Sequence, residues 1–514
     1  MYVLGVDVGT TGTKTALVDD TGLQRGFAYR EYPLIVLGDG GFEQRAQDWW
    51  LTLVDTVREV TTTVKDKSTI RALSLSTQGG SSVLLDARGE PLCNAHTWMD
   101  TRPDSVLDAF SGINERHFYE SSGWRLNGSF MAARAVWLRR NCPEVWARVK
   151  LYLSTADYLN LRLTGRAMID PTNAAMTQLF NIQKMDWDDE ILAAAGVSRS
   201  TLPVIAPSGE AIGTLTQKAA VELGLSEGTL IVSGAHDQYA AAVGAGAFEA
   251  GDTLLSTGTA WVVLCVVNAL KYDYEDYIGI GNHATKGLYG VVTSIPTAGV
   301  ALEWCRKNFA ETEVKDNATL RISFKKLDRI AETRIRQDSE LFFYPQFNGR
   351  AFPRWTSNTK ASFMGLSLEH DSYDMALAIM EGVAFDAAMN LEAYVAKGLP
   401  CEQLKLVGGA GKSRLWTDIV RNVTGLPLVR FRDANITCVG AAAFAAVACG
   451  FFCSIRAAAQ AMTRNSVELL EAPFGELREH YAAKYEAYKV RLPSVERFYP
   501  GFHGPENNPS LLGS

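Results

Sequence analysis

The residues of this chain that could do chemistry gather first at its start, where a carboxylate precedes a loop of glycine and threonine. The chain opens Met1-Tyr-Val-Leu-Gly-Val-Asp-Val-Gly-Thr-Thr-Gly-Thr-Lys14, so an apolar run ends in Asp7 and then turns. Glycines let backbone N–H groups converge on an anion, and threonine hydroxyls add donors. Asp7 is placed to hold a cation or a water beside that anion. The pattern predicts a phosphate-binding loop with a metal partner, and a plain strand–turn–strand hairpin is the alternative.

Two later segments repeat this composition. Ser256-Thr-Gly-Thr259 is a second loop of serine, threonine and glycine, and Gly408-Gly-Ala-Gly411 is a third glycine cluster. Gly411-Lys412-Ser413 looks like the end of a Walker loop, but Leu406 stands where that loop needs its first glycine. The sequence holds no Gly-x-Gly-x-x-Gly fingerprint, which disfavours a dinucleotide site.

Asp237 is the best candidate for a general base. It follows the apolar run Leu230-Ile-Val-Ser-Gly234 and precedes a helix of small residues, Tyr239–Gly244. The N-terminus of such a helix can also face an anion. The alternative is that Asp237 only caps the helix, and His236 is either a base or a structural imidazole. Metallohydrolase and serine hydrolase chemistry is disfavoured, because neither His-Glu-x-x-His nor Gly-x-Ser-x-Gly is present.

Length and composition describe a globular protein of two or more domains. The 514 residues exceed what one hydrophobic core organises, and 47% hydrophobic with 21% charged residues is ordinary. A net charge of −7 gives no electrostatic footprint for nucleic acid. The eight cysteines form no Cys-x-x-Cys pair, so we expect reduced thiols and a cytoplasmic protein. The uncharged segment 438–455 is short and rich in alanine, which favours a buried helix over a membrane span.

Hydrophobic periodicity predicts an α/β protein with strands and helices in alternation. A glycine cluster near 245–252 predicts the domain boundary, giving domains over 1–247 and 248–498 and an irregular tail over 499–514. One phosphate-type loop opens each half, which indicates a duplicated domain with a cleft between the copies. The predicted strands are 2–8, 13–19, 25–32, 70–76, 82–86, 229–233, 404–407 and 427–431, and the predicted helices are 46–64, 104–111, 131–141, 155–163, 215–223, 296–309, 374–397 and 413–424.

These loops, in this order, resemble the phosphate and adenosine loops of the FGGY carbohydrate kinases, members of the actin/Hsp70-like ATPase superfamily. Ala361-Ser-Phe-Met-Gly-Leu366, seven further residues and Asp374-Met-Ala-Leu-Ala-Ile-Met-Glu381 also fit the C-terminal signature of that family. The N-terminal signature, Met131–Asn141, is looser, with Arg134 where lysine is usual.

The resemblance implies two ribonuclease-H-like domains around a central cleft, with ATP and Mg²⁺ as cofactors. Asp237 falls on the base for the sugar hydroxyl, and Asp7 on the acid associated with magnesium. The implied phosphate ligands are Thr10, Thr11, Gly12, Thr13 and Lys14, with Gly258 and Thr259 opposite, and the implied adenosine ligands are Gly408, Gly409, Ala410 and Ser413.

Residues 73–86 and 98–102 resemble the xylulokinase subgroup, which makes D-xylulose the leading substrate, phosphorylated to D-xylulose 5-phosphate. The implied sugar ligands are Gln78, Trp98, Asp100, Arg102, Asp237 and Gln238. Gly79 and Gly80 replace the usual Met and His, which predicts a wider pocket. For Asp100 and Arg102 the alternative is an internal salt bridge.

Other substrates and partners stay open at this point. The Asp237-Gln238 pair also resembles the glycerol kinases, so ribulose, glycerol or erythritol are alternative acceptors. A non-catalytic, actin-like nucleotide-binding protein is the less favoured alternative. We expect small-molecule partners, a sugar and ATP, with no nucleic acid and no membrane. A homodimer is common among members of the family, and the residues do not require one.

Overall fold

The computed structural model describes residues 1–310, 312–315, 318–335, 339–353, 355–356, 358–432 and 435–499. The chain divides into two compact units, and a single boundary does not separate them. Unit 1 contains Met1–Ala250 with the later segments Val266–Val291 and Ala434–Ser466, and unit 2 contains the rest. The predicted division near 247 therefore omits two segments that return to the first unit. Except for Tyr499, the predicted tail lies outside the described residues.

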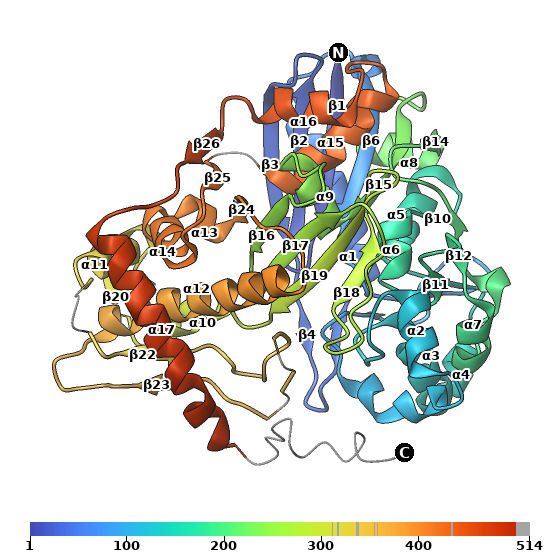
Figure 1. Cartoon of the computed structure of the whole chain (residues 1–514). Helices are drawn as coiled ribbons and strands as arrows, with labels where there is room; N and C mark the ends of the chain where they lie inside the picture. The colour runs from blue at the N-terminus through green and yellow to red at the C-terminus, as the bar shows by residue number, and fades with distance from the viewer. Residues whose placement is uncertain are drawn as a thin grey trace. The chain divides into compact units, whose positions relative to one another are not determined.

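Unit 1 is built on a six-stranded sheet (Figure 1), with the order β14-β15-β6-β1-β2-β3. Three of its strands run parallel, β1, β6 and β15, and each of the others is antiparallel to its neighbour. The carboxyl ends of the three parallel strands therefore meet at one edge. The bounds are β1 Tyr2–Val8, β2 Gly12–Asp19, β3 Gln24–Glu31, β6 Ile70–Thr77, β14 Ala211–Thr214 and β15 Leu230–His236.

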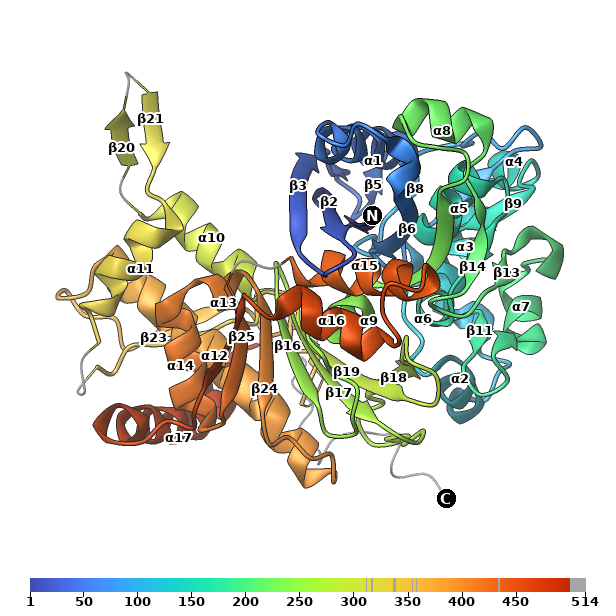
Figure 2. The same cartoon turned by 90° about the horizontal axis from the view of Figure 1, so that it is seen from above.

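Helices cover both faces of this sheet. Helix α1, Ala46–Thr61, packs on one face, and α15, Ile436–Ala448, packs on the other together with α9, Asp237–Gly244 (Figure 2). The apolar stripe of α1 is buried as its periodicity predicts, including Trp49 and Trp50.

Helix α15 confirms the prediction of a buried helix in the uncharged segment. A methyl group on Gly5 of β1 would lie 2.1 Å from the carbonyl oxygen of Cys438, and one on Gly440 would lie 1.9 Å from that of Ala240 in α9. Glycines at these positions let the helix backbone approach its neighbours directly. Among the described residues, no helix combines the length and apolarity needed to cross a membrane.

The second sheet repeats the pattern of the first. Its order is β18-β19-β17-β16-β24-β25-β26, and most of its strands belong to unit 2. As with β1, strand β16 has an antiparallel partner, β17, on one side and a parallel strand, β24, on the other, followed by a second parallel strand, β25. This repetition is the ribonuclease-H-like duplication. The bounds are β16 Thr253–Thr257, β17 Trp261–Val267, β18 Gly279–Asn282, β19 Tyr289–Ile295, β24 Leu404–Gly408, β25 Leu428–Phe431 and β26 Val467–Leu470.

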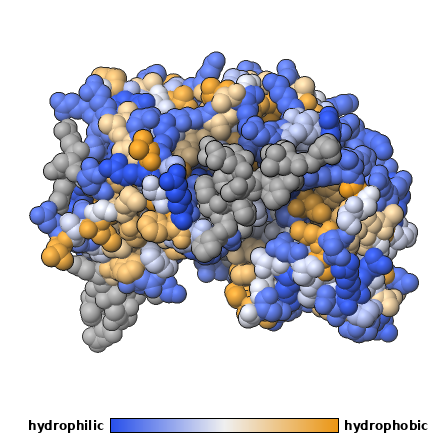
Figure 3. Space-filling model, turned by 60° about the horizontal axis from the view of Figure 1, so that its bottom comes forward, coloured by the Kyte–Doolittle hydropathy of each residue, from blue (hydrophilic) through white to orange (hydrophobic). Residues whose placement is uncertain are grey.

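Three long helices dominate unit 2. They are α12 Ser372–Ala396, α14 Arg414–Thr424 and α17 Glu476–Arg497, and α12 begins with a capping box formed by Asp371 and Asp374. Hydrophobic and hydrophilic residues are mixed over the face of the protein drawn in Figure 3.

The remaining elements are short. In unit 1 they are β4 Ile35–Val36, β5 Phe42–Gln44, β7 Val83–Leu85, β8 Ala95–His96, β9 Leu151–Leu153, β10 Met168–Ile169, β11 Phe180–Asn181, β12 Asp186–Trp187, β13 Val204–Ile205, α2 Glu115–Ser122, α3 Met131–Asn141, α4 Pro143–Trp146, α5 Thr155–Thr164, α6 Pro171–Ala175, α7 Asp189–Ala195, α8 Gln217–Leu223, α16 Ile455–Thr463 and 3₁₀ helices Lys67–Thr69, Arg102–Phe110 and Arg199–Thr201. In unit 2 they are β20 Thr312–Lys315, β21 Ala318–Arg321, β22 Phe342–Tyr344, β23 Ser362–Met364, α10 Gly299–Asn308, α11 Phe324–Glu332 and α13 Gly409–Lys412.

Candidate active site

The loop between β1 and β2 lies at the carboxyl edge of the first sheet and begins beside a buried acid. The Gly9 N–H donates to the Gly12 carbonyl oxygen at 3.1 Å, which closes the turn. Asp7 is 3% exposed, and its carboxylate accepts from Lys14 Nζ and from Ser76 Oγ, each at 3.1 Å. The negative charge of Asp7 raises the pKa of Lys14, so the ammonium group keeps its positive charge at neutral pH.

Hydrogen bonds hold this loop against residues that are far away in the sequence. Trp98 Nε1 donates to Thr10 Oγ1 at 3.0 Å, and Gln44 Nε2 donates to the Thr10 carbonyl oxygen at 2.6 Å. Gln44 Oε1 accepts from Gln78 Nε2 at 3.0 Å and from Trp49 Nε1 at 3.1 Å. Two predicted sugar ligands, Gln78 and Trp98, are therefore brought to the predicted phosphate loop. Sequence reasoning missed Gln44, which connects them.

The predicted phosphate ligands differ in their accessibility. Thr11 is exposed, and Thr10 and Lys14 are partly exposed. Thr13 is fully buried, and its hydroxyl lies 2.7 Å from that of Thr52 in α1, so its side chain joins the loop to that helix.

Asp237 is the first residue of α9, directly after β15. Its side chain is 28% exposed, and the backbone and side chain of Gln238 hydrogen-bond to its carboxyl group, so the alternative of a helix cap stays open. Its Oδ1 atom lies 3.1 Å from His236 Nε2, but the geometry is not that of a hydrogen bond. Oδ1 and the neighbouring Gln238 Oε1 are buried atoms with no hydrogen-bond partner among the described residues. Buried acceptors of this kind are uncommon in proteins unless a ligand supplies the donor.

The surroundings of Asp237 raise the pKa of its carboxyl group. Burial is the main cause; the neighbouring His236 and hydrogen bonds from Gln238 oppose the rise, and the negative charge of Asp7 adds to it. Because β1, β6 and β15 are parallel neighbours, Asp7 and Asp237 both lie at the carboxyl edge of the sheet.

Asp100 and Arg102 adopt the alternative role, an internal ion pair. Asp100 is fully buried; it accepts from Arg102 Nη2 at 2.7 Å and Nε at 3.0 Å, and it lies 3.0 Å from His96 Nδ1. Burial opposes ionisation of Asp100, yet the hydrogen bonds from His96 and Arg102 hold its pKa below the usual range. A sugar could reach Asp100 only by displacing these partners.

The space beside Gly79 is filled by side chains from other elements. A methyl group on Gly79 would lie 2.6 Å from His236 Cδ2 and 2.8 Å from Met176 Cγ. Gly80 has φ +72°, a left-handed conformation that favours glycine for backbone reasons. A pocket wider than a glycerol site stays a prediction, and a local alignment does not show which residues fill this volume.

A buried arginine joins the loops around this pocket. Arg134 is fully buried, and its guanidinium donates to the carbonyl oxygens of Gly80 at 2.5 Å, Thr97 at 2.8 Å and Ser129 at 2.9 Å. Lysine has fewer donors and no planar fork, so it would not reproduce these contacts. Arginine in place of the usual lysine at position 134 therefore lets one side chain bind three separate loop segments.

In unit 2, the second loop and the glycine cluster lie side by side at the ends of adjacent parallel strands. Thr257 pairs with Gly408 in the sheet; its hydroxyl donates to the Val407 carbonyl oxygen at 2.6 Å and accepts from the Ala410 N–H at 3.0 Å. The predicted ligands Gly258, Thr259, Gly408 and Gly409 are exposed. Ala410 is buried, and Ser413 caps α14 by accepting from the Trp416 N–H at 3.0 Å.

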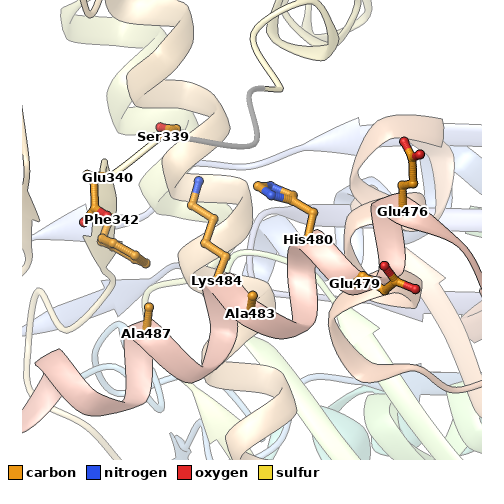
Figure 4. Close-up of a pocket in the computed structure, with 9 residues that line it drawn as sticks. All are labelled: Ser339, Glu340, Phe342, Glu476, Glu479, His480, Ala483, Lys484 and Ala487. Carbon is orange, nitrogen blue, oxygen red and sulfur yellow. The ribbon is translucent and has the colours of Figure 1, made fainter.

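A separate hollow in unit 2 contains none of the predicted site residues. Lys484 and His480 project into it from one face of α17, toward Ser339 (Figure 4). The Lys484 ammonium is neutralised by the buried carboxylate of Glu381, at 2.6 Å. We assign this hollow no part in the chemistry.

Two ribonuclease-H-like units, the first with a buried acid beside a glycine–threonine loop, are the architecture of the actin-like superfamily. The N-terminal domain of the FGGY family of carbohydrate kinases matches residues 2–244, and its C-terminal domain matches residues 256–449. The chain belongs to this family, and it is a sugar kinase whose small-molecule partners are ATP and a sugar.

Individual relatives agree in fold and differ in substrate. A xylulose kinase from Bacillus subtilis (strain 168) is 27% identical over 95% of this chain and 96% of its own length. A gluconokinase from the same organism is 25% identical over 86% of each chain. The crystal structure of a xyloylose kinase from Brucella ovis matches with a TM-score of 0.85 at 26% identity, covering 97% of this chain and 100% of that one.

Proposed function

We propose that this sugar kinase phosphorylates a hydroxyl group of D-xylulose, with Asp237 as the base, to give D-xylulose 5-phosphate. The observation that carries the proposal is Asp237 Oδ1, a buried carboxylate oxygen with no hydrogen-bond donor among the described residues. A sugar hydroxyl would supply that donor. Similarity to xylulose kinases supports the choice of sugar.

The proposed step needs only groups at the carboxyl edge of the first sheet. As the sugar oxygen bonds to the γ-phosphorus of ATP, the bond from that phosphorus to the β,γ-bridging oxygen breaks and ADP leaves. The hydroxyl proton passes to Asp237, whose raised pKa favours accepting it. The amides and hydroxyls of the loop from Gly9 to Lys14 are the proposed donors to the phosphate oxygens.

The residues around Asp7 fit a magnesium ion. Mg²⁺ prefers oxygen ligands and is commonly held by one or two carboxylates together with substrate phosphates. Asp7 offers such a carboxylate, and Lys14 Nζ already places a positive charge 3.1 Å from it. When bound there, the ion would neutralise charge on the phosphates. Asp7 is thus the proposed metal-side acid, distinct from the base.

The choice of acceptor needs a direct test, because a gluconokinase is nearly as similar to this chain as the xylulose kinases are. Ribulose, glycerol and erythritol are further candidates. ADP release should therefore be measured with D-xylulose, D-ribulose, glycerol, erythritol and D-gluconate at equal concentrations. Preference for an acceptor other than D-xylulose would refute the choice of sugar.

The role of Asp237 is tested by Asp237→Asn, which preserves the shape of the side chain. We expect kcat to fall by at least about 10²-fold, because the proton acceptor is lost, while ATP binding stays within twofold. Asp108→Asn, at an exposed carboxylate of unit 1, is the control and should keep wild-type kinetics. Wild-type turnover by Asp237→Asn would exclude this residue as the base.

A further inference from the structure

The side chain of His236 occupies the space next to Asp237 that residue 79 leaves open. His236 is the last residue of β15 and pairs with Thr77 of β6 in parallel register, so Gly79 follows its pairing partner by two positions. A methyl group on Gly79 would lie 2.6 Å from Cδ2 and 2.8 Å from Nε2 of the imidazole. Real side chains do not approach this closely, so the ring and a side chain at position 79 exclude each other.

Glycine at position 79 is required by space and not by backbone conformation. The φ angle of Gly79 lies outside the left-handed region, so an alanine there would meet no backbone strain. Gly80 differs, because its φ of +72° already favours glycine. The sequence therefore accommodates the imidazole by omitting one side chain.

The imidazole is fixed on several sides. The backbone N–H of His236 donates to Thr172 Oγ1 at 2.7 Å and fixes the end of β15, and the ring itself packs on Tyr239 with centroids 6.1 Å apart. Met176 closes the same space, since its Cγ would lie 2.8 Å from a methyl group on Gly79. His236 is only 8% exposed, so it holds one position beside the carboxylate.

We propose that His236 is a positioning and specificity-determining residue of the acceptor site: its ring, admitted by Gly79, holds the Asp237 carboxylate in place and sets the width of the pocket for a polyhydroxylated sugar. The inference rests on the proposed role of Asp237. The ring Nε2 lies 3.1 Å from Asp237 Oδ1, so movement of the ring changes the direction in which the carboxylate meets a hydroxyl. Small errors of position at a reacting group are costly in rate.

Three variants test this coupling, with D-xylulose and the other four acceptors as probes. His236→Ala removes the ring, and Gly79→Ala keeps the ring but displaces it. Each should lower kcat/KM for the preferred acceptor at least tenfold and leave KM for ATP within twofold. The double variant should be little worse than His236→Ala alone, because the clash with the ring is gone and the flexible side chain of Met176, the other close neighbour, can move into the space that the ring vacates.

His236→Gln provides the conservative rescue, since its amide group fills part of the volume of the ring beside Asp237, and it should recover part of the activity lost in His236→Ala. Thermal unfolding shows whether each variant is folded. Should His236→Ala unfold, Gly79→Ala, which retains the imidazole, decides the question.

The proposal is overturned if Gly79→Ala and folded His236→Ala keep wild-type constants and the wild-type ranking of acceptors, or if KM for ATP rises as much as KM for the sugar. Failure of the proposed substrate is a separate outcome, in which the wild-type protein prefers another of the five acceptors. The variants are then compared on that acceptor.

Discussion

Replacing Arg102 with methionine should destabilise the protein strongly, because it leaves a buried carboxylate without its main partner. Asp100 is fully buried and receives two hydrogen bonds from Arg102, at 2.7 Å and 3.0 Å. The guanidinium also donates to Glu43 Oε1 at 3.0 Å, and it is itself 9% exposed. Methionine fills a similar volume, so the change removes the charge and the donors while leaving most of the packing.

The magnitude follows from the burial of the pair. Breaking a buried ion pair by removing one member typically costs about 3–5 kcal/mol, because the remaining charge stays out of water. The double variant Asp100→Asn/Arg102→Met removes that stranded charge and should recover more than half of the loss. Arg140→Met breaks an ion pair of similar length, 3.1 Å to Asp108, whose partners are 47% and 70% exposed, and should leave the stability unchanged.

Urea unfolding at pH 7 and low ionic strength measures these differences, with sugar kinetics recorded on the same samples. We expect the unfolding free energy of Arg102→Met to fall by the stated amount. A direct sugar ligand would behave differently, raising KM for the sugar at unchanged stability. That result would refute the internal ion pair as the role of these residues.

Three further predictions concern α15, a buried acid and the loops of unit 2. Gly440→Ala places a methyl group 1.9 Å from a carbonyl oxygen and should lower the free energy of unfolding, measured in urea, by about 1–3 kcal/mol. The control Gly38→Ala has open space around the new methyl group and should leave that free energy unchanged. Equal stabilities of the two variants would contradict the close approach at Gly440. Burial raises the pKa of Asp157 to about 7, so the folded state holds a proton that the unfolded state releases near its ordinary value of 3.8. The stability that the protonated Asp157 contributes is complete below pH 3.8 and is lost as the pH rises toward 7. The advantage of wild type over Asp157→Asn in unfolding free energy should therefore shrink by about 1.4 kcal/mol per pH unit between pH 5 and 7. A constant difference between the two proteins would disprove the shift in pKa. Thr257→Val loses the two hydrogen bonds that join the adjacent loops and should raise KM for ATP about fivefold, with KM for the sugar unchanged; the opposite pattern would place these loops elsewhere in the reaction.

The sequence predicted best those features that depend on local pattern. The strand over 2–8, the helix over 131–141 and the helix over 374–397 match β1, α3 and α12 to within two residues. Their apolar periods and turn residues are local properties of the chain. The segment 104–111 was expected to be helical and is a 3₁₀ helix, Arg102–Phe110, a distinction that periodicity does not make.

Features that depend on distant residues could not be predicted. Nothing near Gly79 reveals that His236 and Met176 fill the space beside it. The spacing of Asp100 and Arg102 allowed both a sugar site and an ion pair; the structure shows the ion pair, and a role in sugar binding stays a prediction. Arg134 was noted as a departure from a signature, but its three carbonyl acceptors come from three separate segments.

The place of α15 in unit 1 bears on how the protein is made. This helix packs on strands β1 and β6 at one face of the sheet. It begins at Ile436, far along the chain from α9, which ends at Gly244. At ribosomal rates of about 5–20 residues per second, synthesis of the chain between α9 and α15 takes on the order of ten to forty seconds, and β1 waits longer still for this helix. During that time the apolar strand β1, with Val3, Leu4, Val6 and Val8, has one uncovered face. The ribosome therefore synthesises the phosphate loop first, and helix α15, which packs on the strand before that loop, almost last.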